Sequence, residues 1–167
     1  DILIIFLAML MGWPIPLLPI HLLWVNLITD AFPALALGME NKEPGIMDLP
    51  PRDPDESIVN KDMRLSIAVQ SIVLTFAVLA SFYFAYSQYN DLALARTYAF
   101  VTLILSELLR AYTARSERFN LWRIGVFSNR SMNLATLVSM TMLLAVMLIP
   151  ALEELFKLEP FNLTDWE

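Results

Sequence analysis

The sequence LLWVNLITDAFPALALG, residues 22–38, is apolar enough to lie in a lipid bilayer, yet it carries three polar side chains near its middle. Asn26 and Asp30 are four residues apart and Thr29 is three from Asn26, so on an α-helix they share one face. A carboxylate at bilayer depth costs about 2.5–3.5 kcal/mol even on the lenient insertion scale, so it is usually kept for function. Pro33 then removes a backbone donor and favours an opening of the helix. These residues indicate a cation site in a membrane.

The same residues also have a purely structural interpretation. Asn and Thr side chains often hydrogen-bond across membrane helices, which would explain Asn26 or Thr29 taken alone. Asp30 favours the functional interpretation, because a carboxylate in mid-span needs a cation, a proton or a partner.

The composition of the whole chain agrees with a membrane protein. Of its 167 residues, 57% are hydrophobic and 17% are charged, and the mean hydropathy is +0.58. Soluble domains carry about 25% charged residues. Cysteine is absent and histidine occurs once, at His21, which argues against a disulfide framework and against thiolate or imidazole metal centres. The net charge of −6 argues against a nucleic-acid partner and leaves the lipid bilayer as the expected surrounding.

Hydropathy predicts an all-α membrane protein, a helical bundle. Residues 1–11 are an apolar run too short to span alone, and Pro-rich residues 12–19 predict a turn. Full spans are predicted over 20–38, 66–86, 92–112 and 132–149, with polar loops over 40–64 and 113–131. The chain begins without a Met or a basic leader, so we expect a fragment of a larger protein that starts inside a membrane helix.

The positions of Lys and Arg predict the orientation. Nine of them fall in or beside the two polar loops: Lys42, Arg52, Lys61, Arg64, Arg110, Arg115, Arg118, Arg123 and Arg130. The opposite side has only Arg96 and Lys157. By the positive-inside rule, loops 40–64 and 113–131 are therefore expected to be cytoplasmic.

Glu107 is the second acid inside a predicted span. It lies near the cytoplasmic end, three residues from Arg110, so an interfacial ion pair and an ion ligand are equally open interpretations. Gln70 is expected to be a helix-contact residue. Carboxylate, amide and hydroxyl oxygens together suit a hard cation, and two carboxylates favour a divalent one.

The order and spacing of these residues resemble a known family. The Asn26-x-x-Thr29-Asp30 face, the downstream Pro33 and the loop Ile46-Met47-x-x-Pro50-Pro51-Arg52 are similar to the sixth membrane helix and following loop of P-type cation-transporting ATPases, especially the SERCA-like calcium-pump branch. IFLAMLMGWPIPLLPI resembles the end of helix five, and LSELLRAYTARSER resembles helix eight. The resemblance covers nearly the whole chain and implies a single C-terminal transmembrane domain over 1–167, with helices five (partial) to nine.

The resemblance also implies a ligand set and a function. The family's calcium ligands fall on Asn26, Thr29, Asp30 and Glu107, and the acid of helix five falls on Asp1, where these pumps usually have Glu. The parent protein is expected to export Ca²⁺ from the cytoplasm with proton counter-transport, across a plasma (cell) membrane. ATP and Mg²⁺ would bind in the missing domains. The Asp-Lys-Thr-Gly phosphorylation motif is absent here, so this chain alone is expected to be inactive.

Two alternatives remain open at this stage. The same fold could pump Na⁺, Mg²⁺ or H⁺ in place of Ca²⁺. A protein of another class, a non-transporting membrane scaffold or regulatory domain, would tolerate neutral replacements of Asp30 and Glu107, whereas a pump would not.

Overall fold

The computed structural model describes residues 2–40, 42, 47, 59, 61–116 and 121–159, and the long elements in this part of the chain are all helices. In chain order they are α1 (Ile2–Leu10), α2 (Pro19–Trp24), the π-helix η1 (Val25–Asp30), α3 (Ala31–Gly38), α4 (Lys61–Tyr89), α5 (Leu92–Thr113), α6 (Leu121–Ile124), α7 (Arg130–Leu148) and α8 (Pro150–Phe156). The predicted all-α class is confirmed.

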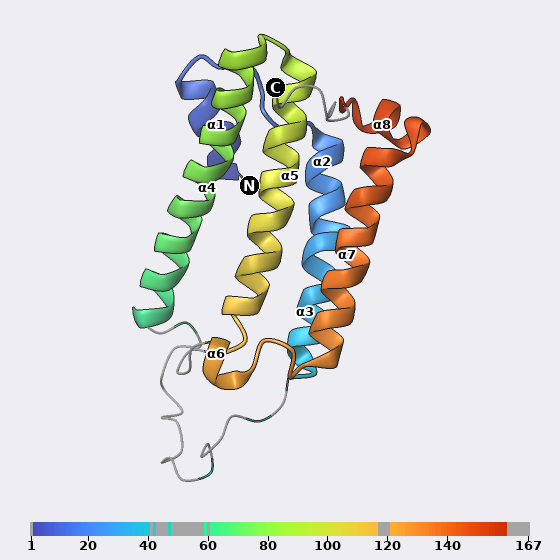
Figure 1. Cartoon of the computed structure of the whole chain (residues 1–167). Coiled ribbons are helices and arrows are strands. Elements are labelled where there is room, and N and C mark those ends of the chain that lie inside the picture. The colour runs from blue at the N-terminus through green and yellow to red at the C-terminus, as the bar shows by residue number, and fades with distance from the viewer. Residues whose placement is uncertain are drawn as a thin grey trace.

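The long helices lie side by side in one bundle (Figure 1). Helices α2, η1 and α3 follow one another as a single column, which α5 contacts on one side and α7 on another. Helix α4 packs on α5, and α1 packs on α4. Helix α6 lies at one end of the bundle and α8 at the other. Because α5 contacts α4, the column and α7, it is the centre of the packing.

Four helices are long and apolar enough to cross a membrane: Pro19–Gly38, Met63–Tyr89, Leu92–Thr113 and Arg130–Leu148. These four segments occupy the regions where full spans were predicted. Their ends differ from the predicted ends by up to three residues. The turn between α4 and α5 has only two residues: Asn90 adopts a left-handed φ of 52°, and Asp91 caps α5. The Asp91 carboxylate accepts hydrogen bonds from the amides of Ala93 (2.7 Å) and Leu94 (3.1 Å).

The helix around Pro33 is widened into a π turn, where the sequence predicted an opening. In an α-helix the carbonyl of Thr29 would accept from the amide of residue 33, and proline has no amide hydrogen. The π-helix over Val25–Asp30 adjusts the backbone directly before this gap, and α3 then continues through Pro33 to Gly38. The column therefore stays helical while its turn at Asn26–Asp30 is irregular.

Helix α8, which follows α7, folds back onto the bundle. Phe156 of α8 is buried, and its ring lies 5.1 Å edge-on from Trp24 and 6.0 Å from Phe100. His21 is fully buried. Its Nδ1 accepts a hydrogen bond from the Leu18 amide (3.2 Å), and its Nε2 lies 2.8 Å from the Phe156 carbonyl oxygen. This pairing requires the neutral tautomer with the hydrogen on Nε2. His21 is therefore a packing residue.

Candidate functional site

The polar residues of the column face a cavity of about 550 Å³ between α1, the α2–η1 column, α4 and α5. Asn26 and Asp30 line it from η1, and Glu107 and Arg110 line it from α5. Gln70, Ser71 and Thr75 line it from α4. The remaining lining side chains are apolar: Ile2, Leu3, Leu22, Ile67 and Leu74. The cavity therefore brings together polar side chains of three helices, η1, α4 and α5.

Thr29 is set apart from Asn26 and Asp30 by the π turn. The predicted shared face assumed the α-helical rotation of about 100° per residue. A π turn closes over five residues instead of four, so each residue rotates less and Thr29 falls short of the face of Asn26. Thr29 is 2% exposed, is absent from the cavity lining, and its hydroxyl has no hydrogen-bond partner among the described residues. The structure thus brings Asn26 and Asp30 to the cavity without Thr29.

Glu107 forms the ion pair that the sequence left open, and it also lines the cavity. Nε of Arg110 lies 2.6 Å from Oε2 of Glu107, one helical turn away on α5. The Glu107 side chain is 9% exposed while that of Arg110 is 48% exposed, so the guanidinium reaches outward and the carboxylate stays inside. The second oxygen, Oε1, is not used in this pair. The two interpretations of Glu107 are therefore compatible in one geometry.

The polar wall contributed by α4 was not predicted. Gln70 was expected to contact a neighbouring helix; it lines the cavity, and its Nε2 donates to Oγ of Ser66 at 3.1 Å. Ser71 and Thr75 were missed, although their spacing of four residues places both on one face of a helix. Hydroxyl groups are common in membrane helices, so that spacing alone is a weak signal. What marks these residues is that they line the same cavity as Asp30.

The remaining predicted ligand, Asp1, lies outside the described residues, as does most of loop 40–64. Within the described part of the chain, no three His, Cys, Asp or Glu side chains are grouped closely enough to hold a metal ion. Asp30 and Glu107 supply two carboxylates and Asn26 an amide oxygen, while Ca²⁺ takes six to eight oxygens. These three side chains therefore supply fewer oxygen ligands than a Ca²⁺ ion takes.

Comparison with known proteins supplies a context for this cavity. Residues 14–167 match the family described as "Cation transporting ATPase, C-terminus". The chain is 34% identical over 181 residues to Calcium-transporting ATPase 1 of Bacillus cereus, covering 99% of this chain and 20% of that protein. It is 34% identical over 167 residues to Calcium-transporting ATPase of Bacillus subtilis, covering 99% and 19%.

A human protein is similar to this chain as well. The chain is 32% identical over 162 residues to human Calcium-transporting ATPase type 2C member 1, with 97% of this chain and 18% of that protein covered. The chain thus spans about a fifth of the length of the curated relatives it matches.

Proposed function

This chain belongs to the family of cation-transporting ATPases, in their C-terminal membrane region, and on that premise we propose that it is the ion-binding membrane domain of a longer ATP-driven pump for Ca²⁺. The observation that carries the proposal is the convergence of Asn26, Asp30 and Glu107 on one cavity from two different helices. The names of the relatives favour Ca²⁺ over the other cations that oxygen ligands can bind.

In this proposal Asp30 is the central ligand. Its carboxylate, the amide oxygen of Asn26 and the free oxygen of Glu107 would replace part of the hydration shell of the ion. Thr29 and Asp1 stay predictions from the family resemblance, because Thr29 is buried away from the cavity and Asp1 lies outside the described residues. Oxygen atoms from the rest of the parent chain would complete the sphere.

The energy for transport would come from domains outside this chain. ATP and Mg²⁺ would bind there, and the phosphorylation state would shift the bundle between conformations with different Ca²⁺ affinities. The isolated chain would then be unable to hydrolyse ATP. Its partners would be the rest of the same polypeptide and the surrounding lipid.

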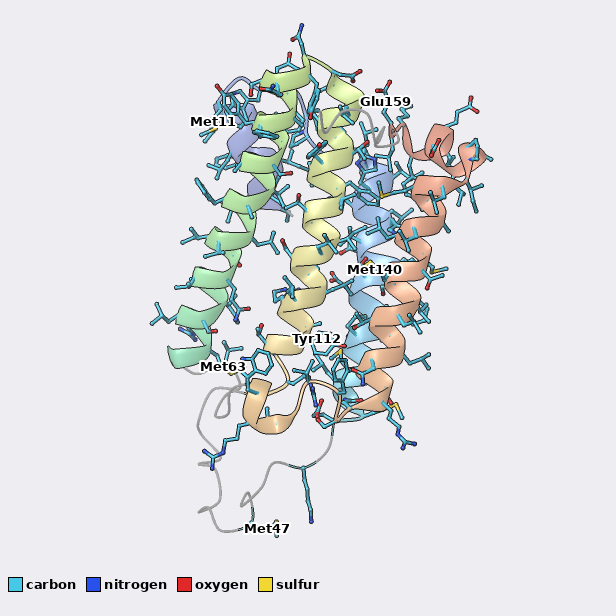
Figure 2. All side chains as sticks on the ribbon, in the orientation of Figure 1. Met11, Met47, Met63, Tyr112, Met140 and Glu159 are labelled. Carbon is cyan, nitrogen blue, oxygen red and sulfur yellow. The ribbon has the colours of Figure 1, made fainter. Side chains whose placement is uncertain are left out.

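Release of Ca²⁺ would leave Asp30 and Glu107 without their counter-charge in a bilayer. Uncompensated carboxylates are expensive there, so we propose that protons replace the ion and are carried back, as in a SERCA-like pump. By the positive-inside rule, the basic loops favour a cytoplasmic side for the ends of α3 and α5 and the start of α7, and we propose a plasma membrane as the location. Tyr112 and Met63 then lie at the cytoplasmic end, and Met11 and Glu159 lie at the opposite end (Figure 2).

The test uses the full-length parent reconstituted into sealed vesicles. ATP-dependent uptake is measured separately for Ca²⁺, Na⁺ and Mg²⁺, and a pH-sensitive dye reports proton movement. The proposal predicts Ca²⁺ uptake accompanied by proton movement in the opposite direction. Uptake of another ion in place of Ca²⁺ would contradict the assigned ion, and Ca²⁺ uptake without proton movement would contradict counter-transport.

Neutral replacements of the two carboxylates distinguish a non-transporting scaffold from a pump. Glu107→Gln and Asp30→Asn would leave a scaffold folded and bound to its partner, with no transport to lose. In a pump they would abolish or strongly weaken Ca²⁺-stimulated ATP hydrolysis.

A further inference from the structure

Helix α7 reaches the π turn through one buried hydroxyl. Oγ of Ser139 lies 3.3 Å from the carbonyl oxygen of Ile28, across 111 residues of sequence, and Ser139 is 1% exposed. Ile28 lies inside η1, between Asn26 and Asp30. The contact therefore joins α7 to the backbone of the turn that carries the cavity's polar residues.

The carbonyl of Ile28 needs a donor from outside its own helix. In the π register the partner of Ile28 would be the amide of residue 33, five positions on, and Pro33 has no amide hydrogen. A buried carbonyl without a donor is costly, and more so in a lipid environment that offers no water. The hydroxyl of Ser139 offers this carbonyl a donor from α7.

A second contact holds the other end of the same column. Nδ2 of Asn129, the cap of α7, donates to the carbonyl of Ala36 at 3.1 Å, near the end of α3. Helix α7 itself contributes no side chain to the cavity lining. Its described polar contacts with the column therefore act on backbone carbonyls and not on the ion.

We propose that Ser139 is a positioning residue for the ion site: its hydroxyl stabilises the π turn that directs Asn26 and Asp30 into the cavity. This inference rests on the proposed function. Without the hydroxyl, the Ile28 carbonyl loses its bond to α7, and the turn that carries Asn26 and Asp30 is no longer held to that helix at this point. A shift of this turn relative to α7 would move Asn26 and Asp30 relative to Glu107 on α5, with which they line the cavity.

The test is Ca²⁺ binding at equilibrium to the full-length ATPase in membranes without ATP, with the maximal rate measured separately at saturating Ca²⁺. Ser139→Ala removes one oxygen atom and is expected to weaken apparent Ca²⁺ affinity about three- to tenfold, the range that one hydrogen bond contributes. The maximal rate per folded molecule should change by less than about twofold, because no ligand is lost. Ser139→Thr keeps the hydroxyl and should retain most of the affinity.

Thr141→Ala is the matched control on the same helix. The Thr141 hydroxyl is bonded within its own helix, 2.8 Å from the carbonyl of Leu137, and its side chain is exposed. Wild-type affinity in both Ser139→Ala and Thr141→Ala would overturn the inference, as would an equal loss in both. A loss of folded protein with unchanged affinity would also overturn it, since that is the effect of a purely structural residue.

Asp30→Asn separates this failure from a failure of the proposed function. If Asp30→Asn abolishes Ca²⁺ binding while Ser139→Ala binds like the wild type, only the positioning role is wrong. If Asp30→Asn itself binds Ca²⁺ normally, the ion site is wrong and the role of Ser139 falls with it.

Discussion

The guanidinium of Arg115 and the carboxylate of Glu40 form a two-point ion pair across 75 residues of sequence, with Nε 2.9 Å from Oε2 and Nη2 2.9 Å from Oε1. The Arg115 side chain is fully buried, and its Nη1 also donates to the carbonyls of Gly125 and Val126. Asn129 donates to the same Oε2 at 2.8 Å. These bonds tie the end of α3 to the start of α7 at the proposed cytoplasmic side.

Glu40→Gln should strongly destabilise the protein. The hydrogen bonds that Arg115 donates to Glu40 raise the pKa of Arg115 above its ordinary value. A guanidinium is not deprotonated in proteins, so Arg115 stays charged in the variant as well. Removing one partner of a buried pair leaves that charge uncompensated, at a cost of about 3–5 kcal/mol. The measurement is the thermal unfolding midpoint of the detergent-solubilised protein. Glu154→Gln, an exposed change of the same type, is the control, and equal midpoints for the two variants would refute the role of the pair.

A stability dependence on pH is expected at the opposite end of the bundle. Partial desolvation, then the charge of Asp91 and a hydrogen bond to it, raise the pKa of Glu159. A carboxyl whose pKa is raised on folding stabilises the fold below the pKa of an ordinary glutamate, and this contribution is lost as the pH rises through the raised value. The unfolding midpoint should therefore fall over that window in the wild type.

Glu159→Gln should flatten this part of the pH profile and raise the midpoint at neutral pH, because Asp91 then faces no second charge. Glu154→Gln should keep the wild-type slope. A wild-type profile in Glu159→Gln would show that the carboxyl pair does not control it.

Phe156→Ala should detach α8 from the bundle. Phe156 packs on Trp24 and Phe100, and its carbonyl accepts from His21. Truncating a buried phenylalanine costs about 3–5 kcal/mol. Leu155→Ala, at a neighbouring side chain that is 57% exposed, is the control. Protease sensitivity after α7 and the unfolding midpoint are the measurements, and a response no larger than that of Leu155→Ala would contradict the packing role.

Variants of Arg110 and Glu107 distinguish an ion ligand from a purely structural ion pair at Glu107. If Glu107 is a ligand, Glu107→Gln should lower Ca²⁺ affinity at least about tenfold, because a charge-assisted contact is lost. Arg110→Gln should keep or raise the affinity, because the guanidinium competes with the ion for the same carboxylate. Equal losses in both variants, measured as equilibrium Ca²⁺ binding, would favour a purely structural ion pair.

The bundle follows from hydropathy, but its polar contacts do not. Apolar length alone located the four spanning helices, since a bilayer imposes one length on them all. The π turn escaped prediction because an α-helical period was assumed for residues 25–30. That assumption grouped Thr29 with Asn26 and Asp30, whereas the structure buries it elsewhere.

Contacts between distant segments were the hardest to foresee. In the sequence, Arg115 and Glu40 are charges in two separate loops. Only the fold shows that they pair, with the Arg115 side chain buried. Ser139 lies among apolar residues of α7 without any motif, and its partner is a backbone carbonyl of another helix, which leaves no mark in the sequence. Asp30 and Glu107, in contrast, were found from sequence because a carboxylate inside a span is rare.

Equilibrium Ca²⁺ binding to the full-length ATPase carrying Asp30→Asn tests the central claim most directly. The substitution keeps the shape of the side chain and removes the charge, and Asp91→Asn outside the cavity is its matched control, since Asn also caps a helix. We predict that Asp30→Asn loses high-affinity Ca²⁺ binding while Asp91→Asn keeps it. Binding of wild-type affinity and amount in Asp30→Asn would contradict the assignment of this cavity as the ion site.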